Sequence, residues 1–99
     1  MTVIKWETIE QPHILKAEAK FDNVYLGTKA FDLVEKWIRE NGYEEEAQLA
    51  LYRVRDEQVR SMWRGEVVHE SSNVNISAKL KVTLYGQAAV QFKLQILQQ

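Results

Sequence analysis

The sequence lacks cysteine and has little proline or glycine. Without cysteine the chain forms no disulfide, and thiolate catalysis and cysteine-ligated zinc or iron–sulfur sites are excluded. No apolar stretch approaches the roughly 18 residues that a membrane span needs. The N-terminal residues also contain no apolar segment of signal-peptide length. We therefore expect a cytoplasmic protein with no membrane segment.

The apolar content is sufficient for one modest hydrophobic core. The chain has 99 residues, of which 45% are hydrophobic and 10% aromatic, a size and composition typical of a single domain. It contains no internal repeat and no linker rich in Gly, Ser or Pro. We expect one domain over residues 1–99, with no cofactor.

The first half of the chain predicts two strands and a helix. Two apolar runs, residues 3–9 and 14–21, flank the single proline, Pro12, as in a pair of strands with a short connection. The second run alternates apolar and charged residues with the period of a half-buried strand. A helix is expected next, with Thr28 as its N-cap and Asn41-Gly42 at its C-terminal end.

Residues 44–64 are open to two interpretations. Their early part has high helix propensity and an apolar spacing that fits a helical face. Alternation with period two instead predicts two strands joined by a turn at Asp56-Glu57, and this is the interpretation we favour. In that hairpin the inward side chains are those of Ala50, Tyr52, Val54, Val59, Ser61, Trp63 and Val67.

The second half ends in the most regular alternation of the sequence. Apolar residues recur at every second position from Val74 to Leu84, and the pattern resumes from Val90. We expect a hairpin with Leu84 opposite Val90 and a loop at residues 86–88. A terminal strand over residues 88–97 could pair with a second copy and form a homodimer.

These elements together predict an α+β fold, with one main helix on a mostly antiparallel sheet of four to six strands. The order β-β-α-β-β-β-β resembles the cystatin-like arrangement with an additional N-terminal strand. The inhibitory hairpin of that family is not present, because Gln58-Val59-Arg60-Ser61-Met62 begins like it and then departs. The resemblance is one of topology, and no protease-inhibitor function is carried over from it.

The predicted registers align basic residues across the outer face of the sheet. They place Arg53 opposite Arg60, Arg60 opposite Lys81, and Lys81 opposite Lys93; we call these four residues the cationic row. The charge is also segregated along the chain, since residues 1–46 carry a net charge of −4 and residues 47–99 carry +3. The candidate partner-binding residues are Arg53, Arg60, Met62, Arg64, Lys79, Lys81 and Lys93.

A row of like charges has two explanations. Lysine and arginine are suited to any solvated sheet face and resist edge-to-edge aggregation. Alternatively, the face binds an anionic partner, either nucleic-acid phosphates or an acidic protein surface. We favour the acidic protein, because Trp63 and Phe92 are expected to point inward, whereas Leu49, Leu51 and Met62 share the face with the arginines.

Two further functions are compatible with the sequence. A small-ligand pocket could lie between the helix and the inner sheet face, around Trp37, Trp63 and Tyr52. An enzyme could use His69 with Glu66 and Glu70, but no nucleophile with a base and an orienting group is evident. We expect no metal site, and a catalytic role has the least support. The sequence therefore favours a non-catalytic interaction module.

Overall fold

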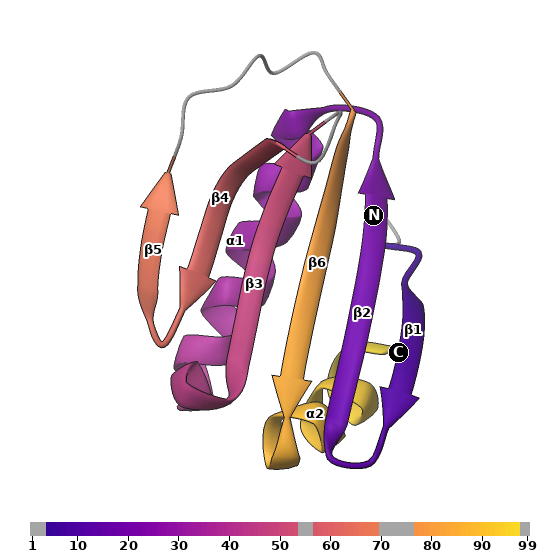
Figure 1. Cartoon of the computed structure of the whole chain (residues 1–99), viewed down its shortest axis with the longest axis vertical. Coiled ribbons are helices and arrows are strands. Elements are labelled where there is room, and N and C mark those ends of the chain that lie inside the picture. Colours follow the sequence, from indigo (N-terminus) through magenta and orange to yellow (C-terminus); the bar gives the residue numbers. More distant parts are fainter. Residues whose placement is uncertain (1–3, 54–56, 70–76, 98–99) are drawn as a thin grey trace.

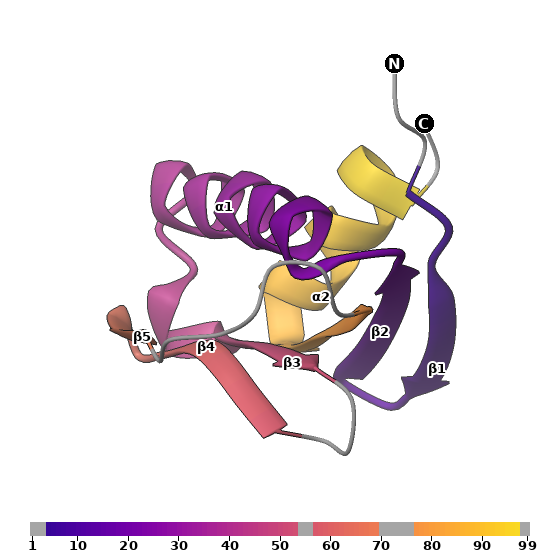
Figure 2. The same cartoon turned by 90° about the horizontal axis from the view of Figure 1, so that it is seen from above.

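A computed structural model describes residues 4–53, 57–69 and 77–97. In these residues, six strands form one antiparallel sheet, and two α-helices lie on one of its faces (Figures 1 and 2). The α+β class and the antiparallel sheet are therefore confirmed. No described helix is long and apolar enough to cross a membrane. The elements are β1 (Glu7–Gln11), β2 (Ile14–Phe21), α1 (Val24–Glu40), β3 (Ala47–Arg53), β4 (Glu57–Trp63), β5 (Glu66–His69), β6 (Ala78–Tyr85) and α2 (Gly86–Phe92).

The strand order is β1-β2-β6-β3-β4-β5. Strand β6 lies at the centre, between β2 and β3, and α1 connects these two neighbours of β6 (Figure 1). The simple succession of hairpins expected from the sequence is wrong here, because β6 pairs with β2 and β3 rather than with β4. Val54 and Val74, which were expected to pair with Val59 and Val67 respectively, lie outside the described residues.

The C-terminal segment is helical, and the predicted hairpin after β6 is wrong. Both edges of β6 already carry a hydrogen-bonded neighbour, so a following strand has no free edge of β6 to pair with. The chain instead forms α2 and then a π-helical segment, Lys93–Leu97. Ala88 and Phe92, four residues apart, are buried, whereas Val90 is exposed. The terminal strand proposed for homodimer pairing is therefore absent.

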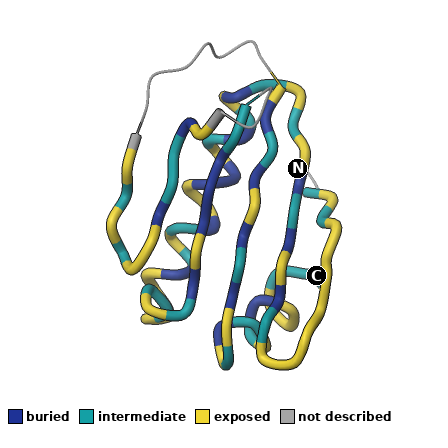
Figure 3. Tube along the Cα trace, in the orientation of Figure 1, coloured by how far each residue is buried: buried dark blue, intermediate teal, exposed yellow. Residues whose placement is uncertain are grey.

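The hydrophobic core fills the space between the sheet and the two helices. Buried residues run along the inner side of the central strands and along the sheet-facing side of α1 (Figure 3). The alternation expected for β2 and for the described part of its neighbour β6 is confirmed. The largest fully buried side chains are those of Phe31, Phe92, Ile38, Leu49, Leu51, Met62, Leu80 and Leu84.

Helix α1 begins earlier than the sequence suggested. The Asn23 Oδ1 atom accepts a hydrogen bond from the Leu26 backbone N–H at 2.8 Å, so Asn23 rather than Thr28 is the N-cap. The predicted C-terminal end is confirmed. Gly42 adopts φ +71°, and the backbone N–H groups of Gly42 and Tyr43 donate to the carbonyl oxygens of Arg39 and Ile38. This is a Schellman motif, in which the left-handed residue ends the helix.

Candidate functional site

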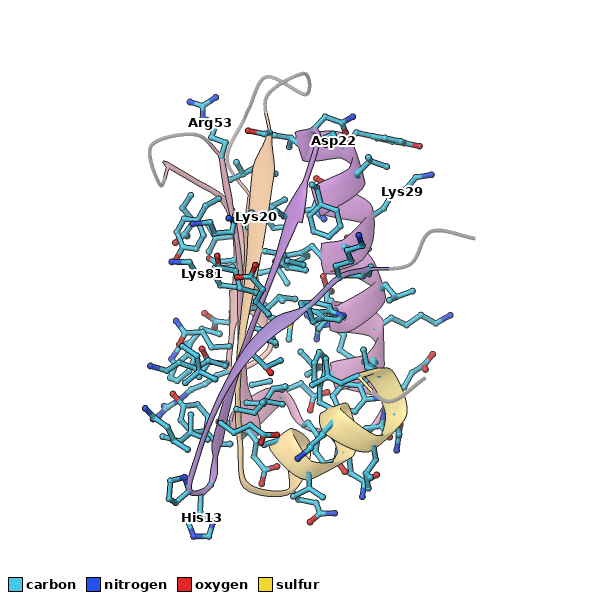
Figure 4. The ribbon with its side chains drawn as sticks, turned by 90° about the vertical axis from the view of Figure 1, so that its right-hand side faces the viewer. His13, Lys20, Asp22, Lys29, Arg53 and Lys81 are labelled. Carbon is cyan, nitrogen blue, oxygen red and sulfur yellow. The ribbon has the colours of Figure 1, made fainter. Side chains whose placement is uncertain are left out.

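One face of the sheet is left open by the helices. Both α1 and α2 lie on the same side, so no described helix covers the opposite face (Figure 2). Lys81 lies on that opposite side, away from α1 (Figure 4). We call this side the open face. Its side chains are those that alternate with the buried residues of each strand.

The pair of strands β3 and β4 is confirmed, while Asp56 of the predicted turn lies outside the described residues. The predicted faces are reversed for most of the hairpin, whereas Val59 lies in the core as predicted. Leu49, Leu51 and Met62 are fully buried against the helices, while Tyr52 and Trp63 belong to the open face. Both alternating sets of β3 contain apolar residues, and the larger aliphatic ones fill the core. Residues paired across two strands lie on the same face of the sheet, so the inward residues of β3 determine which residues of β4 point inward. A β-bulge at Leu51/Tyr52 shifts the register between the two strands.

The expected single strand over residues 59–67 is divided by a tight turn. Trp63 pairs with Glu66, and Arg64 and Gly65 both have positive φ between them, as in a type I′ turn. The turn brings β5 back along β4 as an edge strand. Arg64 therefore belongs to a turn, where its guanidinium lies 5.5 Å from the centre of the Trp63 ring.

Four lysines lie together on the open face of the neighbouring strands β2 and β6. Lys20 of β2 is directly opposite Lys79 of β6, and Lys16 and Lys81 are on the same face of these strands. Lys79 Nζ is 3.6 Å from a carboxylate oxygen of Glu18. Within the described residues, Lys16 and Lys20 form no ion pair. Like charges directly opposite each other on a sheet lower its stability by a few tenths of a kcal/mol per pair.

This lysine group replaces the predicted cationic row. Lys79 and Lys81 lie on the open face as expected, but Lys16 and Lys20 were missed. The alternation of β2 showed that its lysines point away from the core. Only the long-range pairing of β2 with β6 shows that they lie beside Lys79 and Lys81. Arg53 stands at the end of β3, beside Tyr52 in the chain.

Three other candidates lie elsewhere. Arg60 points inward, where its Nη1 is 2.6 Å from Asp32 Oδ1 and its guanidinium lies 5.2 Å from the centre of the Phe31 ring. Met62 is part of the core. Lys93 follows α2, and its Nζ is 2.8 Å from Glu10 Oε1. Arg60 and Lys93 are therefore not neighbours of Lys81 on the open face, and the four-residue row is wrong.

Aromatic side chains accompany the lysines on the open face. Tyr52 is opposite Lys79, and the Lys81 Nζ atom lies 5.2 Å from the centre of its ring. Trp63 is 46% exposed, although the sequence placed it inside. Tyr85, at the end of β6, is 37% exposed. Sequence reasoning missed Tyr52 and Trp63 because it reversed their faces on β3 and β4, whereas it expected Tyr85 on the outer face.

The predicted ligand pocket is not formed. Trp37 lies on the helical side, where its ring centre is 5.5 Å from those of Tyr43 and Phe92. Tyr52 and Trp63 are on the opposite side of the sheet, so the three residues cannot line one cavity. The open face does carry a shallow hollow of about 450 Å³ between β1, β2 and β6. It is lined in part by Ile9, Lys16 and Lys81.

Neither a ligand cluster nor a known relative indicates a particular chemistry. In residues 4–53, 57–69 and 77–97, no group of three or more His, Asp or Glu side chains is placed to hold a metal ion. Glu70, part of the weak enzyme hypothesis, lies outside the described residues. Comparisons with protein-family models, with curated proteins and with solved structures found no match. Support for a function comes from the geometry of the open face.

Proposed function

We propose that this chain is a non-catalytic interaction module whose open face binds an anionic partner. The observation that carries the proposal is the pairing of β2 with β6, which gathers Lys16, Lys20, Lys79 and Lys81 on one uncovered surface. On these two strands the four lysines share the face with one acidic residue, Glu18. Such a local excess of positive charge attracts anions although the whole chain has a net charge of −1.

The support for an acidic protein as the partner is weaker than the sequence suggested. That preference depended on Leu49, Leu51 and Met62 as an apolar centre among arginines, and these side chains are buried in the core. The resemblance to the cystatin-like arrangement brings no binding function to this face. The proposal therefore rests on the lysines. The chemistry of the partner must be inferred from the other side chains of the open face.

The proposal predicts that binding of a polyanion depends on Lys79 and Lys81. The double variant Lys79→Gln/Lys81→Gln should bind heparin about 30-fold more weakly at low salt, since each of the two exposed contacts contributes on the order of 1 kcal/mol. Its affinity should also fall less steeply as NaCl is raised, because fewer charges are screened. Affinity can be measured by isothermal calorimetry across a salt series.

The matched control is Lys29→Gln/Lys36→Gln, which removes the same charge from α1. Both pairs are solvent-accessible, so neither variant should change the free energy of unfolding by more than about 0.5 kcal/mol. Equal losses of affinity in the two double variants would show that net charge alone governs binding, and the open face would then have no special role. Wild-type binding that is absent or insensitive to salt would also contradict the proposal.

A further inference from the structure

We infer that the anionic partner is a single-stranded nucleic acid, whose bases stack on Tyr52 and Trp63 while its phosphates meet the lysines. This inference rests on the proposed function, because it names the partner of the same face. A single strand alternates planar bases with negative charges. Proteins that bind it combine a positively charged surface with exposed aromatic rings.

The aromatic rings of the open face are available for stacking. Trp63 is nearly half exposed. Met62, the residue before it in β4, is fully buried and pairs with Leu49, so Trp63 belongs to the opposite, open face. Tyr52 is half-buried and belongs to the open face, which no described helix covers. The cations that contact these rings, those of Lys81 and Arg64, belong to long exposed side chains. They can move aside at little cost, because cation–π contacts at exposed sites are weak.

Small residues separate the two rings. Trp63 is opposite Gln48, and Ala50 is opposite Ser61, so Ala50 and Ser61 lie between Tyr52 and Trp63 on the face. From Gln48 to Tyr52 the strand advances by about 13 Å, at about 3.3 Å per residue. Ala50 is nevertheless buried, so longer side chains around it lie over this part of the sheet. Lys81, which is opposite Ala50 and contacts the Tyr52 ring, is exposed and would move aside for a strand that crosses from one ring to the other.

The lysines flank the same path. Lys79 is directly opposite Tyr52, and Lys81 is directly opposite Ala50, so both border the surface between the rings. Lys16 and Lys20 extend the positive charge onto β2. A duplex keeps its bases stacked inside, where these rings cannot reach them, so the arrangement suits an unpaired strand. An acidic protein would supply carboxylates for the lysines but would not require exposed aromatic rings.

Tryptophan fluorescence tests the inference directly. Trp6 and Trp37 both pack against Phe92 on the helical side, so Trp63 alone is placed to report contact at the open face. Adding a short oligothymidylate at low salt should quench the emission of the wild-type protein. The quenching should disappear in Trp63→Phe, while binding, measured by anisotropy of a labelled oligothymidylate, is largely retained because phenylalanine also stacks.

Truncation of either ring should weaken binding. Trp63→Leu and Tyr52→Leu should each reduce the affinity for oligothymidylate by about 5- to 150-fold, the range measured for loss of one stacked base. Tyr25→Leu is the matched control, because Tyr25 is exposed on α1, away from the open face. It should leave the affinity unchanged. Circular dichroism melts of all variants separate loss of binding from loss of folding.

The outcomes distinguish this inference from the proposed function. If polyglutamate binds as tightly as oligothymidylate and Trp63 emission does not change, the face binds acidic protein and the inference is overturned, while the proposed function stands. Equal affinity for a duplex of the same length would also overturn it. If none of these probes nor heparin binds, both the inference and the proposed function fail.

Discussion

The Phe92→Ala variant should lose about 3–5 kcal/mol of unfolding free energy, the usual cost of removing a buried aromatic side chain. Phe92 is fully buried. Its ring centre lies 5.6 Å from that of Trp6 and 5.5 Å from that of Trp37, both in edge-on contact. The truncation therefore leaves a cavity where α2, α1 and the N-terminal segment meet. Urea unfolding followed by circular dichroism measures the loss.

Neighbouring residues provide a control that also tests the helical assignment of this segment. In α2 and the turn after it, Val90 and Leu94 are 51% and 54% exposed. Val90→Ala and Leu94→Ala should therefore each change stability by about 0.5 kcal/mol or less. In a strand with alternating faces, Val90, Phe92 and Leu94 would all point inward. Large and similar losses for all three variants would contradict the helix.

Gly27→Ala should destabilise the protein by about 2 kcal/mol, within the usual range for overpacking. Gly27 lies in α1 where the helix crosses the sheet. A Cβ atom there would lie 2.8 Å from Leu51 Cδ1 and 3.1 Å from Ala78 Cβ. Helix propensity alone favours alanine over glycine by about 1 kcal/mol. A net loss of stability would therefore come from the close contacts with the sheet. The same unfolding measurement gives the result.

A double-mutant cycle tests the cause of this loss. Leu51→Ala removes the closer of the two contacting atoms, so Gly27→Ala should cost less in that background than in the wild type. A stabilised Gly27→Ala variant would show that α1 does not approach the sheet as closely as described. If Gly27→Ala destabilises the Leu51→Ala protein as much as it destabilises the wild type, the clash is with Ala78 alone.

The sequence predicted well those features that depend on local patterns. The alternation from Leu15 to Phe21, that of β6 from Ala78, and the Asn41-Gly42 helix end are each determined by residues close in the chain. The preference for two strands over a helix at residues 44–64 was also correct. The helix start was missed because Asn23 and Thr28 are both acceptable N-caps, and only the packing of the first turn on the sheet selects Asn23.

Features that depend on long-range pairing were not predictable from one sequence. The segment from Val90 to Ile96 fits both a strand and a helix, and the choice depends on whether β6 has a free edge. The apolar residues of β3 fall on both of its faces, so the inward set is decided by the space beneath α1. Because the site depends on these choices, Lys79 and Lys81 were found, whereas Lys16, Lys20 and the outward position of Trp63 were not.

The most direct test of the open face is a titration of the ¹⁵N-labelled protein with oligothymidylate, followed by backbone amide chemical shifts. We expect the largest shift changes in β2, β6, β3 and β4, around Lys79, Lys81, Ala50 and Ser61, with little change along the solvent side of α1. Changes confined to α1, α2 or the segment after α2 would show that the helical side binds, and would contradict the central claim.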